Sequence, residues 1–178
     1  MSDWENRFGL SGRTALVTGA SSGIGYAIAE VFADAGADII GHGRSTDRLA
    51  DLGRAVTAKG RKFTAITGDL ACSEQTAAIA ADALAASGGR IDILVNSAGI
   101  AVTGPVVDFA IEDWARTLAV NLTAPFILSK ALLPGMMARR MGKIINISSQ
   151  TGVIALEDHA AYASSKGGLN SLTKSLMV

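Results

Sequence analysis

Short apolar runs alternate along this chain with longer segments in which apolar residues recur every three or four positions. The short runs, with many β-branched residues, predict strands over residues 14–18, 38–42, 62–67, 91–96 and 143–147. The longer segments predict helices over residues 24–35, 46–59, 73–87, 111–140 and 159–178. This alternation through short connections predicts an α/β protein with a parallel, doubly wound sheet and right-handed crossovers.

The first predicted helix has one apolar stripe, the pattern of a helix that packs one face against a core. The stripe consists of Ile24, Ala27, Ile28, Val31 and Phe32. Gly36 follows as the kind of glycine at which helices commonly end, and Gly60 has the same place after the second helix. Ligands of doubly wound sheets bind beyond the carboxyl ends of the strands, where the strand order reverses, so we expect the site there.

Length and composition indicate one domain over residues 1–178, because 49% of the chain is hydrophobic and it is too short for two domains. The 16 basic residues balance 16 acidic ones, so no net charge favours nucleic acid or an anionic membrane. We expect no apolar run to span a membrane, and residues 1–8 lack the apolar core of a signal peptide. The single cysteine, Cys72, permits no disulfide within the chain. We therefore expect a cytoplasmic protein.

The connection between the first strand and the first helix is rich in glycine, since residues 18–25 read T-G-A-S-S-G-I-G. Gly19 and Gly23 permit a tight turn and close approach of a ligand, and Gly25 permits close packing of helix on sheet. The free N–H groups of the helix would then face a pyrophosphate. A plain glycine turn is the alternative, but the position between strand and helix favours a dinucleotide site. Its predicted residues are Gly19, Ser21, Ser22, Gly23, Ile24 and Gly25.

The end of the second strand bears on the choice of cofactor. An acidic residue there would bond the adenosine ribose and favour NAD, but the position is occupied by Gly43, followed by Arg44 and Ser45. A guanidinium suits a 2′-phosphate, so the sequence favours NADP over NAD. The nearby Asp47 keeps NAD open, and the alternative for Arg44 is a solvated loop cation or one stacked on adenine.

Polar residues later in the chain suit proton transfer beside a nicotinamide ring. Tyr162 and Lys166 are four residues apart in the last predicted helix and so share one face. A tyrosine hydroxyl can protonate a carbonyl oxygen, but its pKa is about 10, and bringing it near 7 takes roughly 4 kcal/mol. A lysine ammonium one turn away, with the positive nicotinamide of an oxidised cofactor, can supply that stabilisation. An ordinary surface pair is the alternative for these two residues taken alone.

With the glycine-rich turn, the chain resembles the classical short-chain dehydrogenase/reductase family through four residues in the family's order: Asn121, Ser149, Tyr162 and Lys166. The resemblance covers essentially the whole chain and implies a Rossmann fold that transfers hydride between NAD(P) and a ketone or secondary alcohol. It implies that Tyr162 is the general acid in reduction and the general base in oxidation. It also implies that Ser149 orients the substrate oxygen, with Gln150 beside it, and that Lys166 bonds the nicotinamide ribose.

The same resemblance assigns residues to the adenosine half of the cofactor. Asp69, followed by Leu70, meets the adenine amino group in similar proteins, although a role at a helix N-terminus is the alternative. Residues 96–99, N-S-A-G, match the family's N-N-A-G with Ser97 in place of asparagine. By resemblance this backbone borders the adenosine ribose and steadies the sheet. The residues predicted to do so are Asn96, Ala98 and Gly99.

Pro125 permits a separate inference about Asn121. Proline has no N–H, so the carbonyl of Asn121 loses its helical partner four residues on, and we expect the helix to kink there. A freed carbonyl can hold a water, and the family's proton relay places one at this main-chain position, running on to Lys166. An unkinked helix with that carbonyl bonded inside the protein would remove the basis of this hypothesis.

The last predicted helix is rich in small residues: Ala161, Ala163, Ser164, Ser165, Gly167 and Gly168. Glycine is costly inside a helix, so close packing against another backbone is expected to justify it. In similar proteins this helix and the long one before it pair across a dimer interface, which implies a homo-oligomer, either a dimer or a tetramer. Tight packing within the chain is the alternative.

Similar family members continue for roughly another quarter to a third of their length beyond position 178. We expect that part to hold a sixth strand, the loop that covers the substrate and a final strand, so a truncated product should have weak or no catalysis. The remaining residues near the expected substrate suit a small polar molecule: Ile100, Val102, Gln150, Thr151, Ile154 and His159.

Within the family the chain looks most like the sugar-acid and polyol dehydrogenases, such as gluconate 5-dehydrogenase, partly through residues 8–12 and 43–44. The 3-oxoacyl-carrier-protein reductases are the next most similar group. A non-catalytic dinucleotide-binding or oligomerisation module is the alternative of another class, since fold does not determine function. The intact set of four polar residues argues against long-standing loss of activity.

Overall fold

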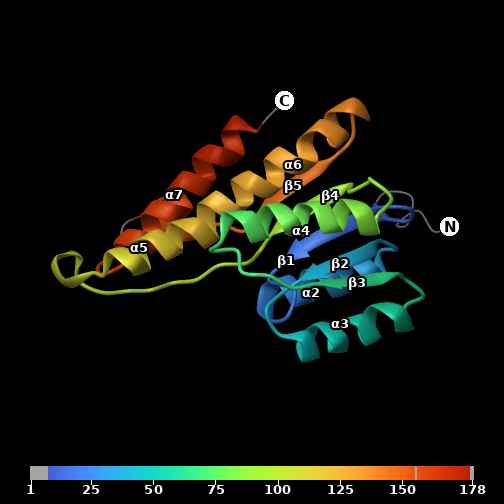
Figure 1. Cartoon of the computed structure of the whole chain (residues 1–178), viewed down its shortest axis with the longest axis horizontal. Coiled ribbons are helices and arrows are strands. Elements are labelled where there is room, and N and C mark those ends of the chain that lie inside the picture. Colours follow the sequence, from blue (N-terminus) through green and yellow to red (C-terminus); the bar gives the residue numbers. More distant parts are fainter. Residues whose placement is uncertain (1–7, 155, 177–178) are drawn as a thin grey trace.

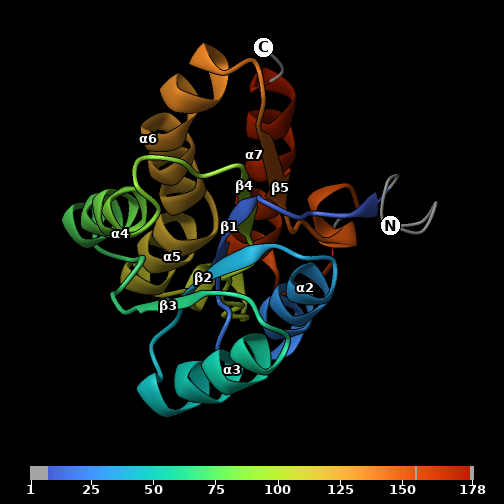
Figure 2. The ribbon, with the colours of Figure 1, turned by 90° about the vertical axis from the view of Figure 1, so that its right-hand side faces the viewer.

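The computed structural model describes residues 8–154 and 156–176 and forms a five-stranded parallel sheet with helices on both faces (Figures 1 and 2). The strands are β1 (Thr14–Thr18), β2 (Asp38–His42), β3 (Phe63–Ile66), β4 (Ile93–Asn96) and β5 (Lys143–Asn146). Their order is β3-β2-β1-β4-β5, and every neighbouring pair is parallel. The strand order reverses between β1 and β4, so the prediction of a doubly wound sheet is confirmed.

The helices follow the predicted segments, but the predicted helix 111–140 is divided by a π-helical turn, and the last helix ends at Ser175, with positions 177–178 of its prediction outside the described residues. They are α2 (Gly23–Asp34), α3 (Thr46–Ala58), α4 (Ser73–Ala86), α5 (Ile111–Leu118), α6 (Ala124–Ala138) and α7 (Ala160–Ser175). Short helical turns are η1 (Val106–Asp108), η2 (Ala119–Thr123) and η3 (Gln150–Gly152). Gly36 and Gly60 end α2 and α3 with φ values of +99° and +70°, as their positions predicted.

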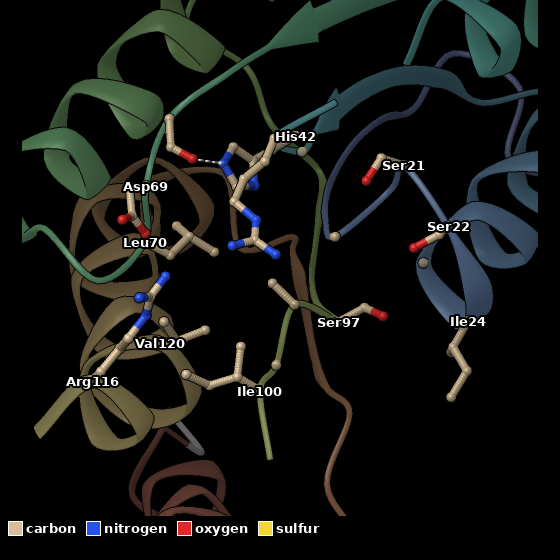
Figure 3. Close-up of a pocket in the computed structure, with 17 residues that line it drawn as sticks. Ser21, Ser22, Ile24, His42, Asp69, Leu70, Ser97, Ile100, Arg116 and Val120 are labelled. Atoms are coloured by element: carbon tan, nitrogen blue, oxygen red, sulfur yellow. Dashed lines mark hydrogen bonds between the residues drawn. The ribbon is translucent and has the colours of Figure 1, made fainter. Parts of the chain in front are cut away.

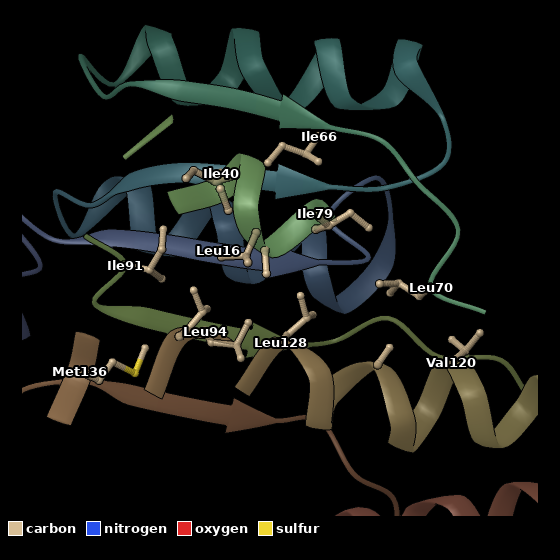
Figure 4. Packing of buried hydrophobic residues seen from close by; sticks show 14 residues of the cluster. Leu16, Ile40, Ile66, Leu70, Ile79, Ile91, Leu94, Val120, Leu128 and Met136 are labelled. Atoms are coloured by element: carbon tan, nitrogen blue, oxygen red, sulfur yellow. The ribbon is translucent and has the colours of Figure 1, made fainter. Parts of the chain in front are cut away.

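The core has two layers, one on each face of the sheet. Because side chains alternate along a strand, Leu16 of β1 points to one face while its neighbours Ala15 and Val17 point to the other. Leu16 packs with residues of α4 and α6, including Ile79 and Leu128 (Figure 4). The opposite layer is formed with α2 and α3. These two layers bury both faces of β1, which explains its continuous apolar run.

The prediction for the buried face of α2 was wrong. Ile24 and Val31 of the predicted stripe are 61% and 62% exposed, while Ile28 and Phe32 are partly buried. The buried positions are instead small: Gly25, Ala29 and Ala33. At Gly25 the physical reason is the close approach of the helix to the end of β1 and the turn after it, because a Cβ there would lie 2.5 Å from the Gly19 carbonyl oxygen and 3.1 Å from that of Thr18. Any side chain is therefore excluded at this position.

The helical stretch Ile111–Ala138 is long and apolar enough to cross a membrane by length and composition, since it contains an 18-residue window with a mean hydropathy of 1.3. The expectation that no apolar run reaches this length was therefore wrong. In this fold the stretch packs Leu128, Leu132 and Met136 into the core against β1 and β4. Its apolar composition is thus explained by its place as a core helix.

Charged groups gather at the amino ends of the strands. Asp92, with only 3% exposure, accepts hydrogen bonds from the Thr14 N–H at 3.0 Å and from Arg90 Nε at 3.0 Å. Burial alone would raise the pKa of Asp92, but these donors, with Arg13 nearby, hold it below its usual value. This network joins β1 to β4 at the edge of the sheet opposite the carboxyl ends.

Close packing within the chain accounts for several of the small residues of α7. Ala161 and Ser165 are fully buried, and a Cβ at Gly168 would lie 2.8 Å from the side chain of Leu122 in η2. The alternative of intrachain packing therefore explains these positions. An oligomer interface on α7 stays a prediction.

Candidate active site

The β1–α2 turn depends on glycine at each predicted position. Gly19 and Gly23 have φ values of +69° and +57°, which side chains rarely permit. A Cβ at Gly19 would lie 2.9 Å from Ala98 Cα, so the turn approaches the segment after β4 very closely. The N-cap residue of α2, Ser22, makes no side-chain capping bond, which leaves the N–H groups of the first turn available to an anion.

A cavity of about 270 Å³ lies beside this turn, at the carboxyl ends of β1 to β4 (Figure 3). Ten residues predicted for the cofactor line it: Gly19, Ser21, Ser22, Ile24, Gly25, Arg44, Asp69, Leu70, Ala98 and Gly99. The structure therefore brings together residues from four separate strand ends. Its apolar and glycine-rich walls, the free helix N-terminus and the arginine fit the chemistry of a dinucleotide.

Some predicted residues are near the cavity but do not line it. Ser45 is the N-cap of α3, where its Oγ accepts from the Arg48 N–H at 3.4 Å. Asn96 is buried and donates from Nδ2 to Asn146 Oδ1 at 2.8 Å, which ties β4 to β5. Gly23, Tyr162 and Lys166 also lie outside the lining. The cavity thus covers the adenosine and phosphate side of the predicted site.

Other residues line the cavity although no cofactor role was predicted for them: His42, Gly43, Gly68, Ser97, Ile100, Arg116 and Val120. Most lie next to a predicted residue at the end of a strand, and that adjacency was the available signal. Arg116 and Val120 come from the long helix instead. Their spacing of four places them on one helix face, but only the fold shows that this face meets the ends of the strands.

His42 ends β2 and is 2% exposed. Its Nε2 lies 3.2 Å from the Gly68 carbonyl oxygen, and burial lowers the pKa of the imidazole below its usual value. The neighbouring Asp69 opposes that shift without cancelling it. The ring both packs at the strand end, as expected, and forms part of the cavity wall.

Tyr162 and Lys166 lie on consecutive turns of α7. The Lys166 Nζ is 5.7 Å from the centroid of the Tyr162 ring and donates to the Ile147 carbonyl at 2.7 Å. Lys166 is 5% exposed, and this burial lowers the pKa of its ammonium. Tyr162 occupies the first turn of α7.

Ser149 follows β5 as the N-cap of η3, and its Oγ accepts from the Thr151 N–H at 3.3 Å and from Thr151 Oγ1 at 2.9 Å. The η3 segment packs directly on α7, since a Cβ at Gly152 would lie 2.8 Å from the Lys166 carbonyl carbon. The segment that follows Ser149 therefore lies against the main chain of α7 at Lys166. The exposed Gln150 begins η3 beside it.

Asn121 is fully buried, and its side chain joins three parts of the fold. Its Oδ1 accepts from the Ile100 N–H at 2.9 Å, and its Nδ2 donates to the Ile100 carbonyl at 2.9 Å and to Ser165 Oγ at 3.0 Å. A Cβ at Gly99 would lie 3.4 Å from Asn121 Oδ1 and 3.6 Å from Lys166 Nζ. Gly99, which lines the cavity, therefore lies near the lysine ammonium.

Around Asn121 the long helix widens into the π-helical turn η2 and then continues as α6. The Ala124 N–H donates to the Ala119 carbonyl, five residues back. The missing N–H of Pro125 is thus accommodated by a local change of helical pitch. The water predicted at the Asn121 carbonyl stays a prediction.

A doubly wound sheet with a glycine-rich first turn and a cavity at the carboxyl ends of its strands has the architecture of the dinucleotide-binding Rossmann class. The model of the short chain dehydrogenase family matches residues 13–178. The chain belongs to this family, which confirms the resemblance seen in the sequence.

Three relatives within the family are similar to this chain in sequence. The D-threitol dehydrogenase of Mycolicibacterium smegmatis is 42% identical over 172 residues, covering 95% of this chain and 65% of the relative. The 2-dehydro-3-deoxy-D-gluconate 5-dehydrogenase of Bacillus subtilis is 42% identical over 172 residues, covering 94% and 65%. A 3-oxoacyl-[acyl-carrier-protein] reductase of Vibrio cholerae is 38% identical, covering 94% and 67%. The chain therefore spans about two thirds of the length of these relatives.

Solved structures with bound cofactor share the fold. A metagenomic short-chain oxidoreductase in complex with NADP has a TM-score of 0.89 and 43% identity, covering 93% of this chain and 75% of that one. A blue fluorescent protein from a metagenomic library, in complex with NADPH, has a TM-score of 0.87 and 35% identity, covering 94% and 68%. These neighbours support a nicotinamide dinucleotide as the cofactor class.

Proposed function

We propose that this protein interconverts a secondary alcohol and a ketone on a small sugar acid or polyol, with NADP preferred over NAD. The observation that carries the proposal is the position of Gly99, which lines the cavity and would have Lys166 Nζ 3.6 Å from a Cβ at that position. A dinucleotide seated in the cavity would therefore extend its nicotinamide end toward the lysine and tyrosine. When bound, the nicotinamide supplies or accepts the hydride.

Proton transfer and substrate positioning are assigned to residues of the chain. Tyr162 gives its hydroxyl proton to the carbonyl oxygen in reduction and takes a proton from the alcohol in oxidation. The Lys166 ammonium stabilises the phenolate that remains. Ser149 holds the substrate oxygen, with Gln150 at the rim. The side chain of Asn121 holds Ile100 and α7 in place. The main-chain carbonyl of Asn121 is assigned to bind a water of the proton relay.

The adenosine half of the cofactor is assigned to the cavity. Arg44 would pair with the 2′-phosphate, Ser21 and Ser22 would contact the pyrophosphate, and Asp69 would accept from the adenine amino group. The NADP and NADPH complexes of two structural neighbours support this cofactor. The names of the threitol and deoxygluconate relatives support the substrate class. We further propose a cytoplasmic homo-oligomer, a dimer or tetramer, that binds neither membrane nor nucleic acid.

A panel of polyols, sugar acids and ketones with NADP and NAD, followed at the nicotinamide absorbance band, tests the activity. Tyr162→Phe should abolish turnover and leave cofactor binding intact, since only the acidic hydroxyl is lost. Persisting turnover would show that another group transfers the proton. Arg44→Ala should weaken NADP far more than NAD, and equal losses would show that Arg44 meets no phosphate.

There are two alternative functions. The Vibrio cholerae relative favours reduction of 3-oxoacyl groups on a carrier protein, and a 3-oxoacyl thioester in the same panel tests it. A non-catalytic dinucleotide-binding or oligomerisation module is the alternative of another class, because fold alone does not determine function. Cofactor binding without turnover of any substrate in the panel would support that module.

A further inference from the structure

His159 lies beside the tyrosine to which proton transfer is assigned. It is the N-cap residue of α7, three positions before Tyr162, and is partly buried. The centroids of the two rings are 6.5 Å apart and their planes are inclined by 68°, which is an edge-to-face arrangement. A substrate whose reacting oxygen meets the Tyr162 hydroxyl would therefore have the imidazole beside its neighbouring atoms.

The two ring nitrogens of His159 have different surroundings. Nδ1 lies 2.6 Å from the main-chain carbonyl oxygen of Glu157. Because a carbonyl oxygen only accepts, Nδ1 carries the hydrogen of the neutral ring, and Nε2 is left as an acceptor. Within residues 8–154 and 156–176, Nε2 has no hydrogen-bond partner, and it is not a buried atom. The ring thus offers one acceptor to a ligand that carries a donor.

The backbone fixes the position of this imidazole. Asp158, directly before it, has a φ of +60° and is one of two non-glycine residues with a positive φ in the described part of the chain. Such backbone strain is found most often at binding and catalytic sites. The Asp158 carbonyl accepts from the Gly104 N–H at 2.9 Å, and the His159 carbonyl accepts from the Ala163 N–H at 2.7 Å. Main-chain bonds to the segment after β4 and to α7 therefore hold His159 next to Tyr162.

We propose that His159 is a specificity-determining residue, whose Nε2 accepts a hydrogen bond from a substrate hydroxyl on the carbon next to the reacting carbon. The proposal rests on the proposed function, because it places the reacting oxygen at Tyr162. It narrows the substrate class to vicinal diols and α-hydroxyketones, the groupings that polyols and sugar acids contain. The ketone of a 3-oxoacyl thioester has no hydroxyl on either neighbouring carbon, so it offers no donor to Nε2.

Two ketones that differ by a single hydroxyl test the assignment on the whole chain: 3-hydroxybutan-2-one and butan-2-one. Their reduction by NADPH is followed at about pH 8, above the range in which histidines commonly take up a proton. His159→Phe keeps a ring beside Tyr162 but has no acceptor. It should lower kcat/KM for the hydroxyketone by about fivefold to tenfold, the worth of one neutral hydrogen bond, and leave that for butan-2-one unchanged. The ratio between the ketones is compared across proteins, so their intrinsic reactivities cancel.

Matched variants separate the hydroxyl contact from a structural role at the start of α7. His159→Gln retains an acceptor in its amide oxygen, so it should keep part of the preference for the hydroxyketone. Glu157→Gln removes an exposed charge next to His159 but keeps the carbonyl that Nδ1 meets, so it should keep the whole preference. The affinity for NADPH, measured by nicotinamide fluorescence, should be equal in all these variants, since the contact is with the substrate.

The outcomes distinguish this inference from the proposed function. An unchanged ratio in His159→Phe, or equal losses on both ketones, would refute the hydroxyl contact and leave the proposed oxidoreductase activity standing. Turnover confined to ketones without a neighbouring hydroxyl, such as a 3-oxoacyl thioester, would refute it as well. If the unaltered protein turned over no compound of the panel with either cofactor, the proposed function and this inference would both be overturned.

Discussion

Replacing Asn121 with alanine tests the idea that its side chain is a structural clamp between Ile100 and α7. Its side chain is fully buried and makes three hydrogen bonds, two of them to the main chain of Ile100 and one to Ser165. Alanine would leave the Ile100 N–H and carbonyl without their partners. Ser165 would keep its bond to the Tyr162 carbonyl at 2.7 Å.

Each orphaned buried backbone group costs about 1–3 kcal/mol, so Asn121→Ala is expected to lower the free energy of unfolding by about 3–5 kcal/mol. Domains of this size have roughly 5–15 kcal/mol of stability, so the variant should fold but be clearly weakened. Urea unfolding followed by circular dichroism measures the difference.

Asn170→Ala is the matched control, because that side chain makes a single bond, to the Gly152 carbonyl at 3.2 Å, and is only partly buried. It should lose about 0.5–1.5 kcal/mol. If Asn121→Ala cost no more than Asn170→Ala, the clamp would be refuted. Asn121 would then matter only through its carbonyl and the proposed water.

Three further changes follow from the fold. Thr18→Val should lower the free energy of unfolding by about 2–4 kcal/mol in urea titration. The reason is that Thr18 Oγ1 accepts hydrogen bonds from the Ser97 and Ala98 N–H groups, where the strand order reverses. A near-neutral result would contradict the assigned strength of these two hydrogen bonds. Gly25→Ala should destabilise the chain and abolish NADPH binding, because its Cβ would lie 2.5 Å from the Gly19 carbonyl oxygen. Gly167→Ala should instead raise the thermal midpoint, because its Cβ would lie 3.6 Å from the Gly152 carbonyl oxygen and alanine is the better helix former. Equal effects of the two substitutions would count against the steric argument. Asp92 has a lowered pKa in the fold, so its contribution to stability is present above the unfolded value near 3.9 and is lost as pH falls through the folded pKa. Asp92→Asn should therefore flatten the loss of stability below about pH 4, and an unchanged acid profile would exclude this carboxylate as its source.

Local chemistry determined much of this protein before any tertiary contact was known. The glycines at 19, 23, 36 and 60 have the positive φ angles that their place at turns and helix ends predicted. The five strands and their alternation with helices followed from the hydrophobic period, which is clearest in β1, β2 and β4, where nearly every residue is buried. The sequence motifs likewise placed the chain in its family.

Tertiary structure decided what depends on the distance between elements. The spacing of apolar residues made Ile24 and Val31 look buried, but the buried positions of α2 hold only glycine and alanine, and at Gly25 there is no room for a side chain. Arg116 had no signal in the sequence, because its role as a wall of the cavity arises only where α5 passes over the ends of β3 and β4. The approach of Asn121 and Lys166 to Gly99 has the same origin, since residues far apart in the chain come close only when the sheet is assembled.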